Sequence, residues 1–145
     1  MTLSDFNIYD IHYFTPGEIE ATGAKLENVQ LTTILKLNVV RHELQRRIHL
    51  LHNGLTTGKH SAEEHPKGLA VDWHLDLRDG PIDFALVKRV VYDSLYAGFR
   101  GIGAYWNGEA YSFHTDCRHN YGMWYGLKDD NNEWEYGDLL VDPKR

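Results

Sequence analysis

The chain has 145 residues, which suits one domain with a hydrophobic core and leaves little room for two. Its formal net charge of -6 argues against nucleic acid as a partner, because non-specific binding to a polyanion needs a basic surface. The single cysteine, Cys117, excludes an intrachain disulfide and a cysteine-based zinc site, so a metal site must use the nine histidines and the carboxylates.

The first helix signal lies near residue 15. Thr15 suits the N-cap, Pro16 suits the first helical position, and Glu18 completes a capping box. We expect Gly23 to end this short helix. A longer helix is predicted over residues 28–47, where apolar side chains recur at every third or fourth position.

Two strands are predicted after this helix. Residues 46–54, RRIHLLHNG, indicate a short strand that runs into a turn at its Asn-Gly pair. Residues 69–77, LAVDWHLDL, alternate between apolar and polar side chains, as expected of a strand with one buried face. On this strand Asp72 and His74 belong to the polar face.

The rest of the chain predicts one more helix and a hairpin. Residues 81–97 show an apolar helical face, and residues 98–118 read as two short strands joined at an Asn-Gly turn. From about residue 129 the composition becomes polar and acidic, which indicates a C-terminal tail.

These elements predict an α+β fold with a small, mainly antiparallel sheet flanked by helices. We expect a single domain over residues 1–145, with its core in about residues 10–125. No apolar run is long enough to span a membrane, so membrane insertion is not expected. The N-terminus lacks the basic and apolar regions of a signal peptide, which predicts a protein that is cytoplasmic as made or exported by another route.

Three residues are candidate metal ligands: His65, Asp72 and His114. A catalytic zinc ion commonly takes three protein ligands and keeps one open position, and histidine and aspartate are suitable ligands for it. The small residues Gly68 and Ala70 would let the loop after His65 return close to the metal. From spacing alone, a surface or hydrogen-bonded role remains open for these histidines, and such a role is the more common one for a single histidine.

Two motifs carry a family resemblance. HPKGLAVD (residues 65–72) resembles the HxxGxAxD signature of the zinc D-Ala-D-Ala carboxypeptidase family, and SFHTD (112–116) is similar to the segment that holds its third zinc ligand. GIGAY (101–105) resembles the glycine-rich strand that precedes this segment in the family. The family includes D-Ala-D-Ala dipeptidases and phage L-Ala-D-Glu endolysins, and it shares its fold with the hedgehog signalling domain.

The resemblance covers about residues 10–125. It implies a zinc-dependent peptidase that acts on the stem peptides of peptidoglycan, with Zn²⁺ bound by His65, Asp72 and His114. It also implies that Trp124 closes one side of the site, as a tryptophan does in many members.

Two departures from the family pattern bear on the substrate. Many relatives carry a serine two residues before the first ligand, where this chain has Glu63. Many also carry an arginine after the first strand that holds a substrate carboxylate, but residues 53–60, NGLTTGKH, contain none. Lys59 is either a substrate-binding replacement or a solvated loop residue, and it offers a point charge instead of a planar fork. Recognition of a C-terminal carboxylate is therefore in question.

The proton-transferring group is not determined by the sequence. Peptide hydrolysis at zinc needs a general base, and Glu109, five residues before His114, is our first candidate. The alternative for Glu109 is an exposed turn residue. Asp116 is a second catalytic candidate, or else a partner that orients a ligand histidine. His74 is another candidate, for proton transfer or for substrate binding.

The leading functional hypothesis is a peptidase that cuts peptidoglycan stem or cross-bridge peptides through a metal-activated water, such as a phage or prophage lysis enzyme. The alternative is a non-catalytic zinc-containing binding or structural module with the same fold, for example in a virion or at the cell wall. The bond that is cut and the oligomeric state are open at this stage.

Overall fold

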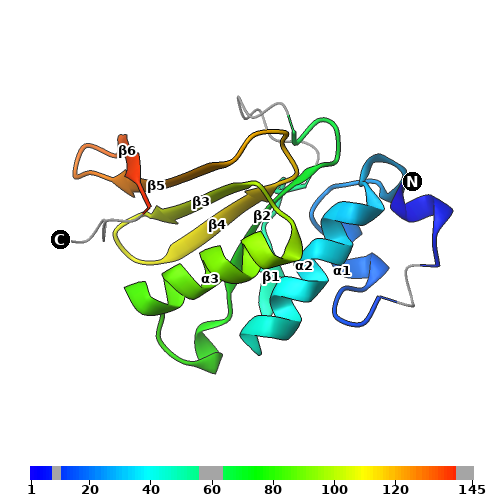
Figure 1. The fold of residues 1–145 in the computed structure, drawn as a ribbon, viewed down its shortest axis with the longest axis horizontal. Helices are drawn as coiled ribbons and strands as arrows, with labels where there is room; N and C mark the ends of the chain where they lie inside the picture. The colour runs from blue at the N-terminus through cyan, green and yellow to red at the C-terminus, as the bar shows by residue number, and fades with distance from the viewer. Residues whose placement is uncertain (8–10, 56–63, 140–145) are drawn as a thin grey trace.

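The computed structural model describes residues 1–7, 11–55 and 64–139. In this described part the chain forms an α+β fold, in which three α-helices accompany a six-stranded, mixed but mostly antiparallel open sheet (Figure 1). None of these helices combines the length and the apolar character needed to cross a bilayer. The expected α+β class with a mainly antiparallel sheet is confirmed.

The helices are α1 (Pro16–Glu20), α2 (Leu31–Leu44) and α3 (Phe84–Ala97). The strands are β1 (Ile48–Leu50), β2 (Ala70–Leu75), β3 (Gly101–Trp106), β4 (Tyr111–Asp116), β5 (Gly122–Lys128) and β6 (Trp134–Asp138).

The helix ends follow from local chemistry. The predicted capping box is present at α1, where the Glu18 main-chain N–H donates to Thr15 Oγ1 over 3.2 Å and the Glu18 carboxylate accepts from the Thr15 N–H over 2.9 Å. The helix α2 is shorter than residues 28–47, because Gln45 adopts a left-handed conformation that ends it. At α3, Asp83 caps the start and Gly98, with φ +102°, closes the end.

The strand order is β1-β2-β4-β3-β5-β6. Strands β3 and β4 form the predicted hairpin, and every neighbouring pair is antiparallel except β3 and β5. The prediction of a polar tail was wrong in part, because residues 134–138 form β6 and pair with β5. The sheet therefore extends two strands beyond the predicted hairpin.

The two faces of the sheet have different surroundings. Trp73 on β2 and Phe113 on β4 pack against each other with tilted rings, their centroids 4.8 Å apart, and are fully buried in the core. Figure 1 shows α2 and α3 side by side along this face of the sheet. Side chains alternate along a strand, so the neighbours Asp72 and His114 lie on the opposite face. Full burial of a side chain such as Phe113 stabilises the fold by about 1.5–3 kcal/mol, which fixes the strands that carry the polar residues.

Candidate metal centre

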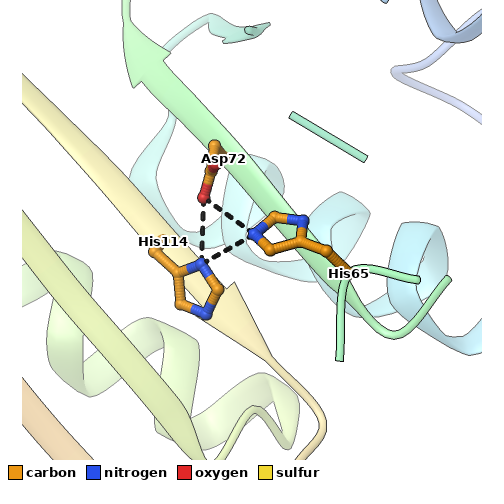
Figure 2. Close-up of side chains that lie close together, drawn as sticks. All are labelled: His65, Asp72 and His114. Carbon is orange, nitrogen blue, oxygen red and sulfur yellow. Dashed lines mark hydrogen bonds and ion pairs between the residues drawn. The ribbon is translucent and has the colours of Figure 1, made fainter. Parts of the chain in front are cut away.

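The three candidate ligands meet on the face of the sheet that is turned away from α2 and α3. His65 Nε2 lies 3.2 Å from His114 Nδ1 and 3.4 Å from Asp72 Oδ1, and the last two atoms are 2.9 Å apart. Figure 2 shows the three side chains pointing toward one another, from the loop before β2, from β2 and from β4. His65 and His114 are buried and Asp72 is half-buried. The sequence prediction that these residues come together is confirmed.

The strand register and one loop produce this arrangement. Asp72 and His114 are direct cross-strand neighbours, so their side chains are adjacent on one face. His65 is delivered by the loop that ends at Gly68, whose N–H donates to the His65 carbonyl over 2.9 Å. Thr33 Oγ1 on α2 donates to the Gly68 carbonyl over 2.8 Å and fastens the loop to the helix layer.

The role of Gly68 differs from the expected one. We predicted that its small size leaves room near the metal. Instead, Gly68 has φ +70°, and a Cβ atom there would collide with the main-chain carbonyl of Asn28. The motif glycine is therefore required for the packing of the loop against residues 28–30 and for its turn conformation.

The distances between the ligand atoms suit a tetrahedral zinc ion. Zinc bonds of about 2.0–2.1 Å to nitrogen and oxygen place two ligand atoms of a tetrahedron about 3.3 Å apart. The three observed distances of 2.9, 3.2 and 3.4 Å bracket this value. Two imidazoles and one carboxylate also form a typical catalytic donor set. The residues present therefore fit a zinc ion with an open fourth position.

Each ligand histidine is oriented by a bond from its other ring nitrogen. His114 Nε2 donates to Asp116 Oδ2 over 2.6 Å, and His65 Nδ1 lies 3.4 Å from the carbonyl oxygen of Leu55. Such bonds fix the tautomer and the ring plane, and they leave His114 Nδ1 and His65 Nε2 for the metal. This places Asp116 in the orienting position, which is the second of the two roles considered for it.

Asp116 is in turn held by Arg118. The Arg118 main-chain N–H and Nε donate to Asp116 Oδ1 over 3.0 and 2.8 Å, and Nη2 donates to Oδ2 over 2.6 Å. The Asp116 side chain has no exposed surface, so this arginine neutralises a fully buried charge. A Cβ atom at Gly101 would collide with both side chains, so the glycine in this strand leaves space for the pair.

The site holds its carboxylates ionised. Burial disfavours the charge of Asp72, but hydrogen bonds from His114 and His65 outweigh it and lower the pKa to about 2. Burial also opposes the charge of Asp116, yet Arg118 and His114 hold its pKa well below the usual range. For His114, burial lowers the pKa and the carboxylates of Asp116 and Asp72 raise it to a net value above the ordinary one. Zinc and a proton would therefore compete for this histidine, since the metal needs its neutral form.

A cavity of about 580 Å³ opens beside the three ligands, within the usual size range for small-ligand sites. It is largely walled by aromatic and cationic side chains from β3, β5, β6 and the β4–β5 connection: Tyr105, Arg118, Trp124, Trp134 and Tyr136. Trp124 lies with its ring centroid 5.5 Å from that of His114, and its Nε1–H donates to Tyr105 Oη over 2.7 Å. Trp124 thus lines the site, as the resemblance implied.

The other predicted site residues lie elsewhere. Glu109 is exposed in the turn between β3 and β4 and is not part of the cavity lining. Five residues of extended chain separate it from His114, a span of about 16 Å, which does not support its role as the base. His74 lines a second cavity, of about 660 Å³, that shares Leu51 and Ser112 with the first. Lys59 and Glu63 lie outside the described residues.

In comparisons with known proteins, no family model matches this chain, and no curated protein or solved structure matches it significantly.

Sequence reasoning missed several residues of the cavity lining, among them Tyr105 and Arg118. Tyr105 follows Gly101 and Gly103 at alternate positions of β3, so the GxGxY spacing already places it on the same face as the glycines. The signal for Arg118 was its position two residues after an aspartate, where its main-chain N–H and side chain both reach the carboxylate.

Proposed function

We propose that this chain is a zinc-dependent peptidase that hydrolyses stem or cross-bridge peptides of peptidoglycan. The observation that supports this most strongly is the convergence of His65 Nε2, Asp72 Oδ1 and His114 Nδ1 at tetrahedral spacing beside an open cavity. The family resemblance of the two motifs supplies the substrate class. Phage or prophage lysis is one setting in which such an enzyme reaches the wall.

In this proposal His65, Asp72 and His114 hold the zinc. A bound zinc ion polarises a carbonyl group and lowers the pKa of water from 15.7 to about 7. Asp116 keeps the His114 ring in the plane and tautomer that present Nδ1 to the metal. Tyr105 Oη accepts the indole proton of Trp124, so its own hydroxyl proton is available to donate to an oxygen atom of the substrate.

A second candidate function is a zinc-containing binding or structural module without turnover. One observation favours it: among the residues that the structure describes, Asp72 is the only carboxylate that lines the cavity, and it is already a ligand. An unassigned proton acceptor is the weak point of the peptidase proposal. The two functions differ in turnover but share the zinc.

The test measures zinc content together with the release of new amino groups from purified peptidoglycan. We expect stoichiometric zinc and amino-group release for the wild type, and loss of both for His114→Ala. His74→Ala is the matched control, because His74 lies on the same sheet face but in the other cavity. Zinc without release from any wall substrate would support the binding module, and a wild type without zinc would overturn both proposals.

A further inference from the structure

Arg118 is built into the cavity as a fixed, planar cation. Its Nε and Nη2 are bonded to the buried carboxylate of Asp116, and the guanidinium carbon lies 4.9 Å from the centroid of the Trp124 ring. The carboxylate fixes the group at one edge, and the indole fixes its plane by a cation–π contact. The side chain is 33% exposed, so it is held on two sides and open on a third.

The open side of the Arg118 guanidinium faces the cavity beside the candidate metal ligands. Arg118 lines the cavity, and within the described part of the chain its Nη1 donates no hydrogen bond. A guanidinium carries five N–H donors, of which Asp116 takes those on one edge only. The Nη1 donors therefore remain for a group that enters the cavity.

Three glycines in the sheet leave space for the side chains of Arg118 and Trp124. Gly101 on β3 and Gly122 on β5 are paired neighbours, and Cβ atoms at either position would press on the Arg118 side chain. A Cβ atom at Gly103 would lie 2.7 Å from the Trp124 ring. We call Gly101, Gly103 and Gly122 the glycine floor. It lets Arg118 and Trp124 lie close to the sheet beside the candidate ligands.

We infer that Arg118 forms a carboxylate-binding subsite next to the metal centre. Arginine is the side chain whose geometry matches a carboxylate, and a preorganised fork loses little freedom on binding. This inference rests on the proposed peptidase function and specifies its substrate: a peptide with a free carboxylate close to the bond that is cut. Arg118 lies outside the 53–60 stretch in which relatives carry an arginine for this purpose.

The subsite is close to the metal centre. Asp116 Oδ2 accepts hydrogen bonds of 2.6 Å from both Arg118 Nη2 and His114 Nε2, so one carboxylate oxygen separates the guanidinium from the histidine ring. One extended residue spans about 3.3–3.6 Å. The carboxylate of the ligand therefore belongs to a residue within about two positions of the bond at the metal. It comes from the chain terminus or from an acidic side chain.

The experiment compares three peptides for binding to the zinc-loaded protein. The probes are N-acetyl-D-alanyl-D-alanine, its C-terminal amide, and an amidated N-acetyl dipeptide whose only carboxylate is a glutamate side chain. Binding is followed by the shift of the Trp124 indole N–H resonance, assigned from Trp124→Phe. For the wild type we expect at least one of the two acids to bind at least tenfold more tightly than the amide.

Variants of Arg118 then test whether this arginine causes the preference for the acids over the amide. In Arg118→Gln the acid-to-amide ratio should fall to about one, and because any change in the zinc site affects both peptides, the ratio and not the amide affinity is the readout. Arg118→Lys should retain part of the ratio, because lysine keeps the charge without the fork. The matched control is Arg100→Gln, since Arg100 stacks on Tyr121 near the same end of the sheet but does not line the cavity.

A wild-type ratio near one, or a ratio that survives in Arg118→Gln, would overturn the inference. The second result would mean that the zinc itself binds the carboxylate. The ratio is internally controlled, because a damaged cavity would weaken the acid and the amide together. Wall hydrolysis without an acid preference would overturn the subsite alone, and an Arg118-dependent preference without hydrolysis would overturn the peptidase alone.

Discussion

Two strands of this sheet end in the same pattern, His-x-Asp-x-Arg, but only one of the two copies contributes to the candidate metal centre. HLDLR ends β2 at residues 74–78, and HTDCR ends β4 at residues 114–118. Because β2 and β4 are antiparallel neighbours, the two copies lie at opposite ends of the strand pair.

The two copies are almost identical in their local bonding. The arginine main-chain N–H donates to the aspartate over 2.9 Å in Arg78 and 3.0 Å in Arg118, and Nη2 donates over 2.6 Å in both. Each aspartate also bonds to the Nε2 of a histidine, over 2.8 Å for Asp76 and 2.6 Å for Asp116. The Asp-x-Arg unit is therefore a local device that neutralises an inward carboxylate at the end of a strand.

The copies differ in which histidine is bonded and in what surrounds it. Asp116 bonds to His114 of its own motif, whereas Asp76 bonds to His49 on β1. His49 is 44% exposed in its side chain and His114 only 6%. In the described part of the chain, the loop that brings His65 reaches the histidine of the second copy, His114, and not that of the first, His74. A metal site here thus depends on long-range placement of a third ligand, and the local motif is insufficient.

The largest difference between the two copies should appear when one histidine is removed near each of them, His65 beside His114 and His49 beside Asp76. His65→Ala should abolish stoichiometric zinc, because two protein ligands remain and the loss exceeds the 10–100-fold typical of orienting partners. His49→Ala should leave zinc content unchanged. Zinc analysis of both proteins after gel filtration measures the difference, and equal loss in both would place the metal elsewhere.

A smaller effect is expected from the two aspartates. Asp116→Asn should weaken zinc binding about 10–100-fold, because the amide no longer accepts a charge-assisted bond from His114 Nε2. Asp76→Asn should leave zinc affinity unaltered. Competition with a chromogenic chelator gives both constants. Unchanged zinc affinity in Asp116→Asn would show that the His114 ring is oriented by other contacts.

The glycine floor beside the candidate site leads to a prediction about fold stability. Gly103→Ala should destabilise the fold by about 1–3 kcal/mol, because its Cβ would lie 2.7 Å from the Trp124 ring. Gly17→Ala is the control, since a Cβ there would meet only Thr15 Oγ1 at 3.9 Å, and helix propensity favours alanine. Urea unfolding of both variants measures the difference. Equal stabilities would mean that Trp124 moves aside without cost.

The smallest effect concerns acid stability at the β2 end. Hydrogen bonds from the Arg47 side chain and main chain lower the pKa of Asp79 to about 2. An aspartate with a lowered pKa stabilises the fold above its unfolded pKa of about 3.9, and the contribution is lost as the pH falls through the folded value. Asp79→Asn should therefore be less stable than wild type at pH 7, and the two should converge between about pH 4 and pH 2.

Urea unfolding at a series of pH values follows this convergence. Zinc content at pH 7 should be the same in Asp79→Asn and wild type, because Asp79 bonds to Arg47 and not to the ligand set. A stability difference that persists undiminished at pH 2 would contradict the assignment of the bond to the ionised carboxylate.

The local parts of the structure were predictable from sequence. The capping box at Thr15, the alternation along residues 69–77 and the Asn-Gly turn of the β3–β4 hairpin each depend on neighbouring residues. The convergence of the three candidate ligands was predictable because His65 and Asp72 share a motif and His114 follows on a strand that pairs with β2.

The remainder depends on contacts between distant segments. Strand β5 pairs in parallel with β3 on the side opposite to β4, although β4 lies between them in the chain, and no local pattern in residues 122–128 indicates such a partner. The position of Trp124 beside Tyr105 in the cavity wall follows from that pairing. Likewise, the sequence alone does not show which of the two His-x-Asp-x-Arg copies belongs to the candidate metal centre, because this depends on where the loop of His65 lies.

The glycine floor has a consequence for how mutational tolerance in this protein should be read. A saturating scan should mark Gly101 and Gly103 as intolerant as the metal ligands, although neither has a side chain that could bind anything. At both positions the important property is the absence of a side chain, because Asp116, Arg118 and Trp124 fill the space that a side chain would need. Glycines that do not tolerate substitution would thus mark the part of the sheet on which the candidate site is built.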